Sequence, residues 1–209
     1  AGGSAIAVAF DGLNYVTGDE SGALRIWSVA DGKQTFESKL AAGVTQLAWR
    51  RDNKQIAAGL ANGSIVLVNP ADGKPTVEVG AHQGAVTGLQ YSTSNTLLFS
   101  AGADGLAKRW PTNPTPVIEG FKEAKAIHSM ALHPSGTMIV TATANGAHVW
   151  NRADGKYLRP LEGLTGEINS TSYSSNGAQV ATGGADKIAR TFNPATGKLI
   201  KAFPAMTGK

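Results

Sequence analysis

Cysteine is absent from this sequence of 209 residues, which excludes disulfide bridges, thiolate-bound zinc and cysteine nucleophiles. Long apolar runs are absent too. None approaches the roughly 20 residues of a membrane-spanning helix, so we expect no membrane partner. Charged residues are scarce at 16 %, whereas apolar residues reach 42 %, so the chain has the composition of a protein that buries a core rather than of a disordered one.

Basic residues are present but scattered along the chain. The 19 Lys and Arg outnumber the 15 Asp and Glu and give a formal net charge of +4. However, no basic run exceeds two residues, as in Arg50-Arg51 and Lys108-Arg109. Because nucleic-acid recognition needs a clustered basic surface rather than a net positive charge, we expect no nucleic-acid partner.

A repeat of about 41 residues runs through the chain. The string Ala-Asp-Gly-Lys occurs at 30–33, 71–74 and 153–156, and Ala195–Lys198 is a near copy. A second marker keeps the same interval, since a large apolar residue recurs at Trp27, Val68, Trp110, Trp150 and Phe192. Two independent markers with one period indicate a repeat architecture of five units.

Each unit is predicted to contain four short antiparallel strands. Asn-Gly and Asp-Gly dipeptides, which favour two-residue hairpin turns, separate apolar and β-branched stretches that are too short for ordinary helices. In the third unit the expected strands are Val86–Tyr91, Thr96–Ala101, Leu106–Trp110 and Pro116–Glu119. Four-stranded units at this period are typical of β-propeller blades, which stack because a lone sheet cannot cover both of its apolar faces.

The sequence therefore predicts an all-β fold, a five-bladed β-propeller with four antiparallel strands per blade, in one domain over residues 1–209. The expected blades span residues 5–42, 43–84, 85–125, 126–166 and 167–209. Each blade is complete in sequence order, so no strand is left to act as a clasp between the two ends. We favour a closed, monomeric ring held by apolar contact between the first and last blades. An incomplete ring would instead expose apolar faces and self-associate.

At the end of the third strand of each unit the sequence resembles the WD-repeat family, which has Trp-Asp there. The corresponding pairs are Trp27-Ser28, Val68-Asn69, Trp110-Pro111, Trp150-Asn151 and Phe192-Asn193, so the Trp is kept three times and the Asp never. The resemblance covers essentially the whole chain and is carried by pattern and spacing. It implies a scaffold that binds a protein or peptide partner, with neither catalysis nor a cofactor.

Four residues of the third unit allow two interpretations. His82, Ser100 and Asp104 are the residue types of a nucleophile triad, but Ser100 lies in Leu98–Gly102, which lacks the Gly-x-Ser-x-Gly elbow. In the WD-repeat family the same types at this spacing form a structural network with a Trp, here Trp110. A buried indole N–H needs an acceptor, which a hydroxyl supplies while an imidazole links it to a carboxylate. We expect the structural network and no catalytic residue.

The other units keep only parts of this network. No other unit has the matching His, and the Ser position holds Thr17, Ala58, Thr141 and Thr182. We therefore expect the third blade to be the best fixed by polar contacts. The second blade, with Ala58 and Val68, is expected to depend on apolar packing alone.

No metal or phosphate site is expected. His128, His133 and His148 fall in one unit, but the first two are an odd number of positions apart in an extended segment, which places their side chains on opposite faces. Gly183–Lys187 is rich in glycine, yet a phosphate-binding loop needs Gly-x-x-x-x-Gly-Lys-Ser/Thr ahead of a helix.

The resemblance implies a binding face built from the loops that enter each first strand and the turns after each second strand. The polar residues expected to contact a protein or peptide there are Asp19, Glu20, Lys39, Gln83, Lys122, Glu123, Lys125 and Glu167. Lys122 and Lys125 are the preferred pair, because the loop 120–126 mixes charge with Phe121.

Two other functions stay open. The chain is alternatively an excised or partial propeller segment of a larger protein, possibly multi-domain or enzymatic, with a purely structural role. An enzyme that uses the central channel is the third hypothesis. Against it, the inner strands, such as Ile6–Phe10, Val44–Trp49 and Ile168–Tyr173, contain no Asp, Glu or His apart from His128 and His133.

Overall fold

Short apolar stretches between tight turns fold into twenty β-strands and five separate sheets. The structure is a computed structural model that describes residues 3–112 and 119–203. None of these residues is helical, and the described chain accordingly has no helix able to cross a membrane. The predicted all-β architecture with four strands per blade is confirmed.

Every blade is an antiparallel meander of four consecutive strands. The first contains β1 (Gly3–Val8), β2 (Asn14–Asp19), β3 (Ala23–Ser28) and β4 (Gln34–Lys39). The second contains β5 (Val44–Trp49), β6 (Ile56–Leu60), β7 (Ser64–Val68) and β8 (Pro75–Gly80). The third contains β9 (Val86–Tyr91), β10 (Leu97–Gly102), β11 (Leu106–Pro111) and β12 (Glu119–Lys122). The fourth contains β13 (Ile127–Leu132), β14 (Met138–Thr143), β15 (Gly146–Asn151) and β16 (Tyr157–Pro160), and the last contains β17 (Ile168–Tyr173), β18 (Val180–Gly184), β19 (Ala189–Phe192) and β20 (Leu199–Phe203).

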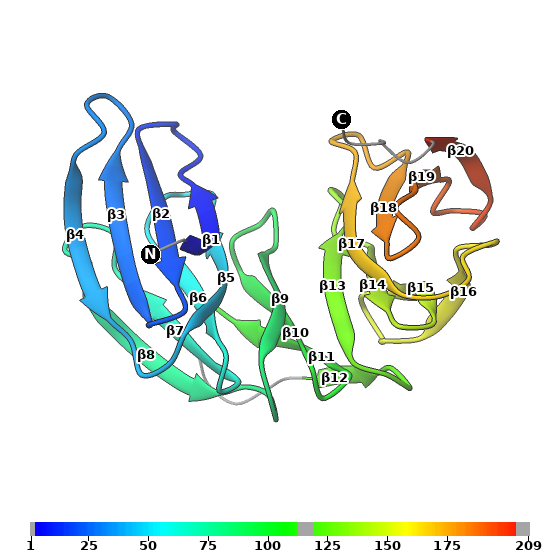
Figure 1. The fold of residues 1–209 in the computed structure, drawn as a ribbon, viewed down its shortest axis with the longest axis horizontal. Helices are drawn as coiled ribbons and strands as arrows, with labels where there is room; N and C mark the ends of the chain where they lie inside the picture. Colours follow the sequence, from blue (N-terminus) through cyan, green and yellow to red (C-terminus); the bar gives the residue numbers. More distant parts are fainter. Residues whose placement is uncertain (1–2, 113–118, 204–209) are drawn as a thin grey trace.

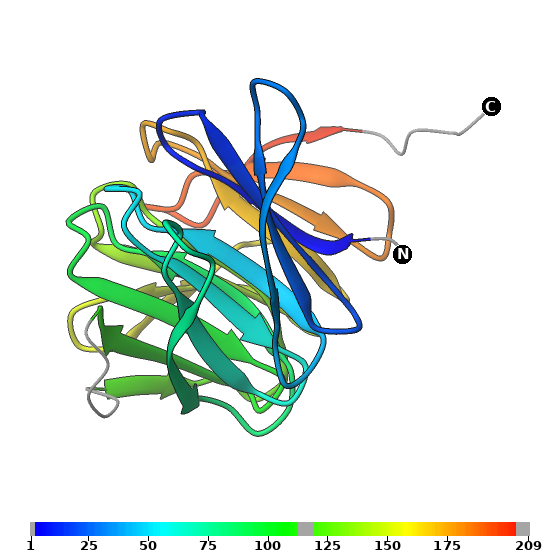
Figure 2. The same ribbon diagram turned by 90° about the vertical axis from the view of Figure 1, so that its left-hand side faces the viewer.

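The blades are arranged radially, with the first strand of each sheet toward the centre and the fourth at the periphery (Figure 1). The side view shows the twist of the sheets (Figure 2). Among residues 3–112 and 119–203, each sheet contains only its own consecutive strands, and no strand is exchanged between the first and last blades. The fourth strand of the third blade was predicted over Pro116–Glu119. Residues 116–118 lie outside the described residues, and β12 begins at Glu119.

The 41-residue marker corresponds to one register position in every blade. It stands on the third strand, directly opposite an apolar residue of the second strand. The pairs are Trp27 with Tyr15, Val68 with Ile56, Trp110 with Leu98, Trp150 with Ile139, and Phe192 with Val180. Equivalent residues of different blades can therefore be compared position by position.

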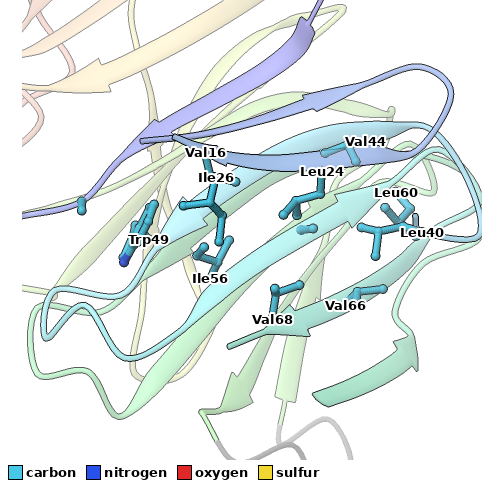
Figure 3. Close-up of a cluster of buried hydrophobic side chains, with 12 residues drawn as sticks. Val16, Leu24, Ile26, Leu40, Val44, Trp49, Ile56, Leu60, Val66 and Val68 are labelled. Carbon is cyan, nitrogen blue, oxygen red and sulfur yellow. The ribbon is translucent and has the colours of Figure 1, made fainter. Parts of the chain in front are cut away.

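The core lies between neighbouring sheets rather than within any one of them. Between the first two blades, Val16 and Ile26 of the first pack against Trp49, Ile56 and neighbouring residues of the second (Figure 3). Three further clusters join successive blades in the same way. Since full burial of one such side chain contributes about 1.5–3 kcal/mol, these interfaces supply most of the stabilisation of the fold.

The first and last blades do not meet. The inner strands pack in succession from β1 through β5, β9 and β13 to β17, but no comparable contact joins β1 to β17 within the described chain. Figure 1 shows the opening between them. The closed five-blade ring that we favoured is therefore wrong. The side chains between sheets fix the angle from one blade to the next, and five such steps do not complete a circle.

Between the second and third blades, close approach requires glycine at one position on the second strand. A methyl group added at Gly59 would lie 2.6 Å from Val86 Cγ1 of the third blade. Gly183 occupies the same register position in the last blade. There the one described atom within 4 Å is Ser170 Oγ, at 2.9 Å, the end of an exposed side chain that can rotate.

We predict that Gly59→Ala lowers the free energy of unfolding by about 1–3 kcal/mol, because the added methyl group overpacks a well-filled interface. Gly183→Ala is the matched control and is expected to change stability by less than about 0.5 kcal/mol, since no blade covers that face. Urea unfolding followed by tryptophan fluorescence measures both variants. Equal losses would show that the last blade is covered.

Candidate functional site

All five inner strands begin at the same edge of the propeller. The turns after the second strands lie at that edge as well, because strands within a blade alternate in direction. We call this edge the loop rim. It contains the loops 40–43, 81–85, 123–126 and 161–167 and the turns 20–22, 61–63, 103–105, 144–145 and 185–188.

Backbone hydrogen bonds attach the rim loops to the turns of both flanking blades. The Leu40 N–H donates to Gly22 O of the first blade at 2.8 Å, and Gly43 O accepts from Ala61 N of the second at 2.8 Å. The next loop repeats this arrangement through Ala81 N to Gly63 O and Ala103 N to Ala85 O, both 3.0 Å. The rim is thus a connected surface rather than a set of independent loops.

In the third blade a chain of side-chain hydrogen bonds connects the rim to the interior. Trp110 Nε1 donates to Ser100 Oγ at 2.9 Å, and Ser100 Oγ lies 2.7 Å from His82 Nε2. His82 Nδ1 lies 3.0 Å from Asp104 Oδ1. All three hydrogen bonds form when the Ser100 hydroxyl donates to His82 Nε2 and the proton on His82 Nδ1 is donated to Asp104. Asp104 also accepts from the backbone N–H of Gln83 at 3.0 Å, which fixes the rim loop.

The order Ser-His-Asp matches that of a hydrolase triad, but the surroundings do not. Ser100 is 0 % exposed, and its oxygen already accepts from an indole. Burial lowers the pKa of His82, although the Asp104 carboxylate opposes that shift. Burial also raises the pKa of Asp104, but backbone N–H groups and His82 outweigh it and leave that pKa below its ordinary value. A neutral imidazole beside a carboxylate, buried at the edge of a sheet, fits a structural role.

The fourth blade has a comparable network that sequence reasoning missed. Glu123, 6 % exposed, accepts from Thr141 Oγ1 and from Trp150 Nε1, the latter at 3.2 Å. His148 Nδ1 lies 3.0 Å from Glu123 Oε1. Glu123 stands 41 positions after His82, so the repeat period itself places it at the histidine position. The sequence prediction considered only histidine at this position, whereas the Glu123 carboxylate makes the equivalent hydrogen bonds to the hydroxyl and the indole.

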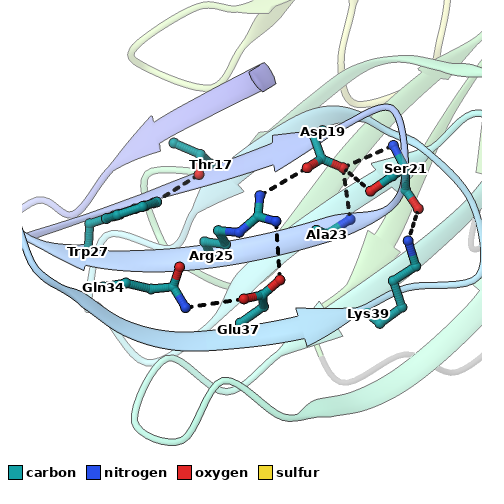
Figure 4. Close-up of polar contacts among 9 residues, drawn as sticks. All are labelled: Thr17, Asp19, Ser21, Ala23, Arg25, Trp27, Gln34, Glu37 and Lys39. Atoms are coloured by element: carbon teal, nitrogen blue, oxygen red, sulfur yellow. Dashed lines mark hydrogen bonds and ion pairs between the residues drawn. The ribbon is translucent and has the colours of Figure 1, made fainter. Parts of the chain in front are cut away.

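In the first blade a buried carboxylate pairs with a guanidinium at the rim (Figure 4). Asp19, 4 % exposed, accepts from Ser21 Oγ at 2.6 Å and from Arg25 Nη1 at 2.9 Å. The Ser21 hydroxyl, followed by Arg25, holds the pKa of this carboxyl well below its usual range. Arg25 also reaches Glu37 at 3.2 Å, and Trp27 Nε1 donates to Thr17 Oγ1 at 2.9 Å.

The structure divides the eight residues that the sequence assigned to partner binding. Two corrections are needed, because Asp19 and Glu123 are buried in the networks of their blades and do not present their carboxylates to a partner. The other six are exposed, namely Glu20, Lys39, Gln83, Lys122, Lys125 and Glu167.

The remaining candidates have ordinary contacts. His148 stands opposite Thr141, the position that Arg25 holds opposite Thr17, and it contacts Glu123. The described residues contain no group of three potential metal ligands. In the second blade Ala58 and Val68 lie in an apolar cluster with Trp49.

The repeated meander, the recurrent tryptophan position and its hydroxyl acceptor agree with what two family models find in the sequence. The model described as "Anaphase-promoting complex subunit 4 WD40 domain" matches residues 21–94, and "WD domain, G-beta repeat" matches residues 155–193. The chain belongs to the WD-repeat family. Protein-interaction scaffolding is the general role of WD-repeat families.

Similar WD-repeat proteins come from diverse eukaryotes. Eukaryotic translation initiation factor 3 subunit I from Culex quinquefasciatus is 24 % identical over 173 residues, 76 % of this chain and 53 % of the relative. Cilia- and flagella-associated protein 52 from Mus musculus is 24 % identical over 195 residues, 90 % of this chain and 32 % of the relative. U3 small nucleolar RNA-associated protein 21 from Saccharomyces cerevisiae is 24 % identical over 180 residues, which are 84 % of this chain and 19 % of the relative. The chain thus spans about half, or less, of these relatives.

We predict that Ser100→Ala lowers the free energy of unfolding by about 1–3 kcal/mol, because it strands the buried Trp110 N–H and the His82 ring nitrogen. Ser64→Ala, on a half-buried position without this network, serves as the control and is expected to stay within about 0.5 kcal/mol of the parent. Denaturant unfolding provides the comparison. A Ser100→Ala protein as stable as the parent would mean that the network contributes nothing.

The lowered pKa of His82 makes stability depend on pH. Unfolding restores the ordinary histidine pKa of about 6.5, so below that value the unfolded chain binds the extra proton and the folded state loses stability. Asp104 stays ionised in this window because its pKa is lowered. From pH 7 to pH 5 the free energy of unfolding should therefore fall more for the parent than for His82→Gln. Parallel urea titrations test this, and equal slopes for the two proteins would contradict it.

Proposed function

We propose that this WD-repeat chain is a non-catalytic scaffold that binds an acidic segment of a protein or peptide partner at the loop rim, around Lys122 and Lys125. The observation that carries the proposal is the anchoring of the loop between them. Glu123 is fixed inside the fourth blade by Thr141 and Trp150, which leaves the two lysines on its two sides exposed.

The electrostatics of this site favour an anionic partner. Within the described residues, neither Lys122 nor Lys125 forms an ion pair, so both charges are available to a partner. The backbone of the loop is fixed on one side by the bond from Glu123 N to Gly105 O at 2.8 Å. A preordered loop loses little conformational freedom on binding, which increases the affinity gained from each contact.

The relatives are consistent with a role in assemblies. One is named as a subunit of translation initiation factor 3, and another as a protein associated with cilia and flagella. A purely structural role as one part of a longer propeller is the second candidate. The uncovered first and last blades favour it, and it is compatible with binding at the loop rim.

Charge reversal at the preferred pair tests the proposal. Peptides selected from a random phage-displayed library on the parent protein are expected to be rich in Asp and Glu. They should bind Lys122→Glu/Lys125→Glu about tenfold more weakly or worse, a loss of roughly 1.4 kcal/mol.

The control is Lys74→Glu/Lys156→Glu, which makes the same charge change on the opposite rim, where both side chains are 79 % exposed. Its affinity for the selected peptides should match that of the parent. If both double variants lose affinity alike, binding follows net charge and the loop rim has no special role.

A further inference from the structure

Between the first and second blades lies a cleft of about 440 Å³, at the edge of the propeller opposite the loop rim. Ile26 and Phe36 of the first blade form one wall, and Trp49 with the turn 69–71 of the second blade forms the other. The cleft at the equivalent place between the second and third blades measures only about 10 Å³. Small-molecule sites typically enclose about 300–1,000 Å³, so the first interface has room for a ligand and the next does not.

Residues at matching positions of the repeat explain the difference in size. Trp110 lines the small cleft, whereas its register counterpart in the second blade is Val68. Across the second interface, the Tyr91 hydroxyl also donates to Gln55 Oε1 at 3.0 Å. The small cleft is thus closed both by an indole and by a hydrogen bond between the blades.

The first interface has neither of these features. Trp49 is the counterpart of Tyr91 there. Within the described residues Trp49 Nε1 has no hydrogen-bond partner, although the side chain is only 5 % exposed. Figure 3 shows this nitrogen at the end of the ring that is turned away from the aliphatic cluster. Because buried N–H groups are almost always paired, the first interface lacks an acceptor as well as a large planar group.

The mouth of the cleft carries one negative and one positive side chain, Asp11 from the first blade and Lys54 from the second. Asn53 fixes the two turns to each other, since its Nδ2 donates to Asp11 Oδ2 at 2.8 Å and its Oδ1 accepts from the Phe10 N–H at 2.9 Å. Neither Asp11 nor Lys54 forms an ion pair within residues 3–112 and 119–203. A ligand that bears both an ammonium and a carboxylate matches this mouth, because each of its charges then meets an opposite one.

We propose that this cleft binds a free aromatic amino acid. The ring of the ligand takes the space that Trp110 fills in the next interface, against Ile26 and Phe36. Its carboxylate contacts Lys54 and is the acceptor for Trp49 Nε1, and its ammonium contacts Asp11. This inference is independent of the partner proposed for the loop rim, which lies at the opposite edge.

Titration of the full chain with L-tryptophan tests the proposal. The chain has four tryptophans, and in the ¹⁵N-labelled protein each gives its own indole N–H signal by NMR. The Trp49 signal, identified by its loss in Trp49→Phe, should shift and reach saturation. The Trp150 signal should not shift, because Trp150 stacks on Phe121, which lines a separate cleft of about 240 Å³ between the third and fourth blades.

Two variants should weaken the binding of tryptophan. Val68→Trp/Ala58→Ser gives the second blade the indole–hydroxyl pair of the third, and the added ring should fill the cleft and lower the affinity about tenfold or more. Lys54→Gln leaves the core intact because Lys54 is exposed, and it should also cost about tenfold through loss of the contact with the carboxylate. Its matched control is Lys74→Gln, on the same edge but outside the cleft, which should bind tryptophan like the parent.

A second probe separates a free amino acid from an aromatic residue within a peptide. N-acetyl-tryptophanamide keeps the ring but lacks both charges, so it should bind about tenfold more weakly than tryptophan. If it binds as tightly, the occupant is a residue of a peptide chain and the proposal fails. The proposal fails too if no indole signal moves near the solubility limit of tryptophan, or if the Trp150 signal shifts in place of that of Trp49. Equal affinities of Lys54→Gln and Lys74→Gln would likewise overturn it.

Discussion

Every element of this molecule depends on the packing of one twisted sheet against the next. A four-stranded sheet has two faces, and neither can hold a core alone. The faces are covered because the chain repeats one pattern, in which Val16 and Ile26 of one blade pack against Ile56 and its neighbours on the following blade. The hydrogen bonds within each blade set the register, but the apolar contact between blades stabilises the register once it has formed.

The polar networks, in contrast to the apolar interfaces, differ from blade to blade. The indole of Trp27, Trp110 or Trp150 always finds a hydroxyl two pairs away on the second strand. An imidazole in the third blade and a carboxylate in the fourth connect that hydroxyl to the rim, whereas in the first blade the aspartate–arginine pair fixes the rim turn through Ser21. The second blade has no such polar link at Ala58 and Val68, where apolar packing takes its place. Several chemistries thus satisfy one geometric requirement, which is to fix a loop at the edge of a buried sheet.

Most of the architecture could be predicted from the sequence because it is periodic. The number of strands, their order and the position of Trp110 over Ser100 follow from the spacing and from turn chemistry. Two kinds of feature escaped. Burial of Asp19 and Glu123 depends on partners that only the strand register brings near, such as Arg25 and Trp150. A prediction based on their charge therefore placed them incorrectly on the surface. The failure of the ring to close depends on the angle between blades, a cumulative property that no single repeat encodes.

The opening between the first and last blades gives the molecule two ends, and this has a consequence for how it comes apart. Interior sheets are held from both sides, whereas β1–β4 and β17–β20 are each held from one side. In a linear array with nearest-neighbour coupling, loss of structure starts at the termini and moves inward, as fraying does in a helix. The third blade, in the middle of the array and fixed by its His82–Ser100–Asp104 network, is then the last to lose its structure.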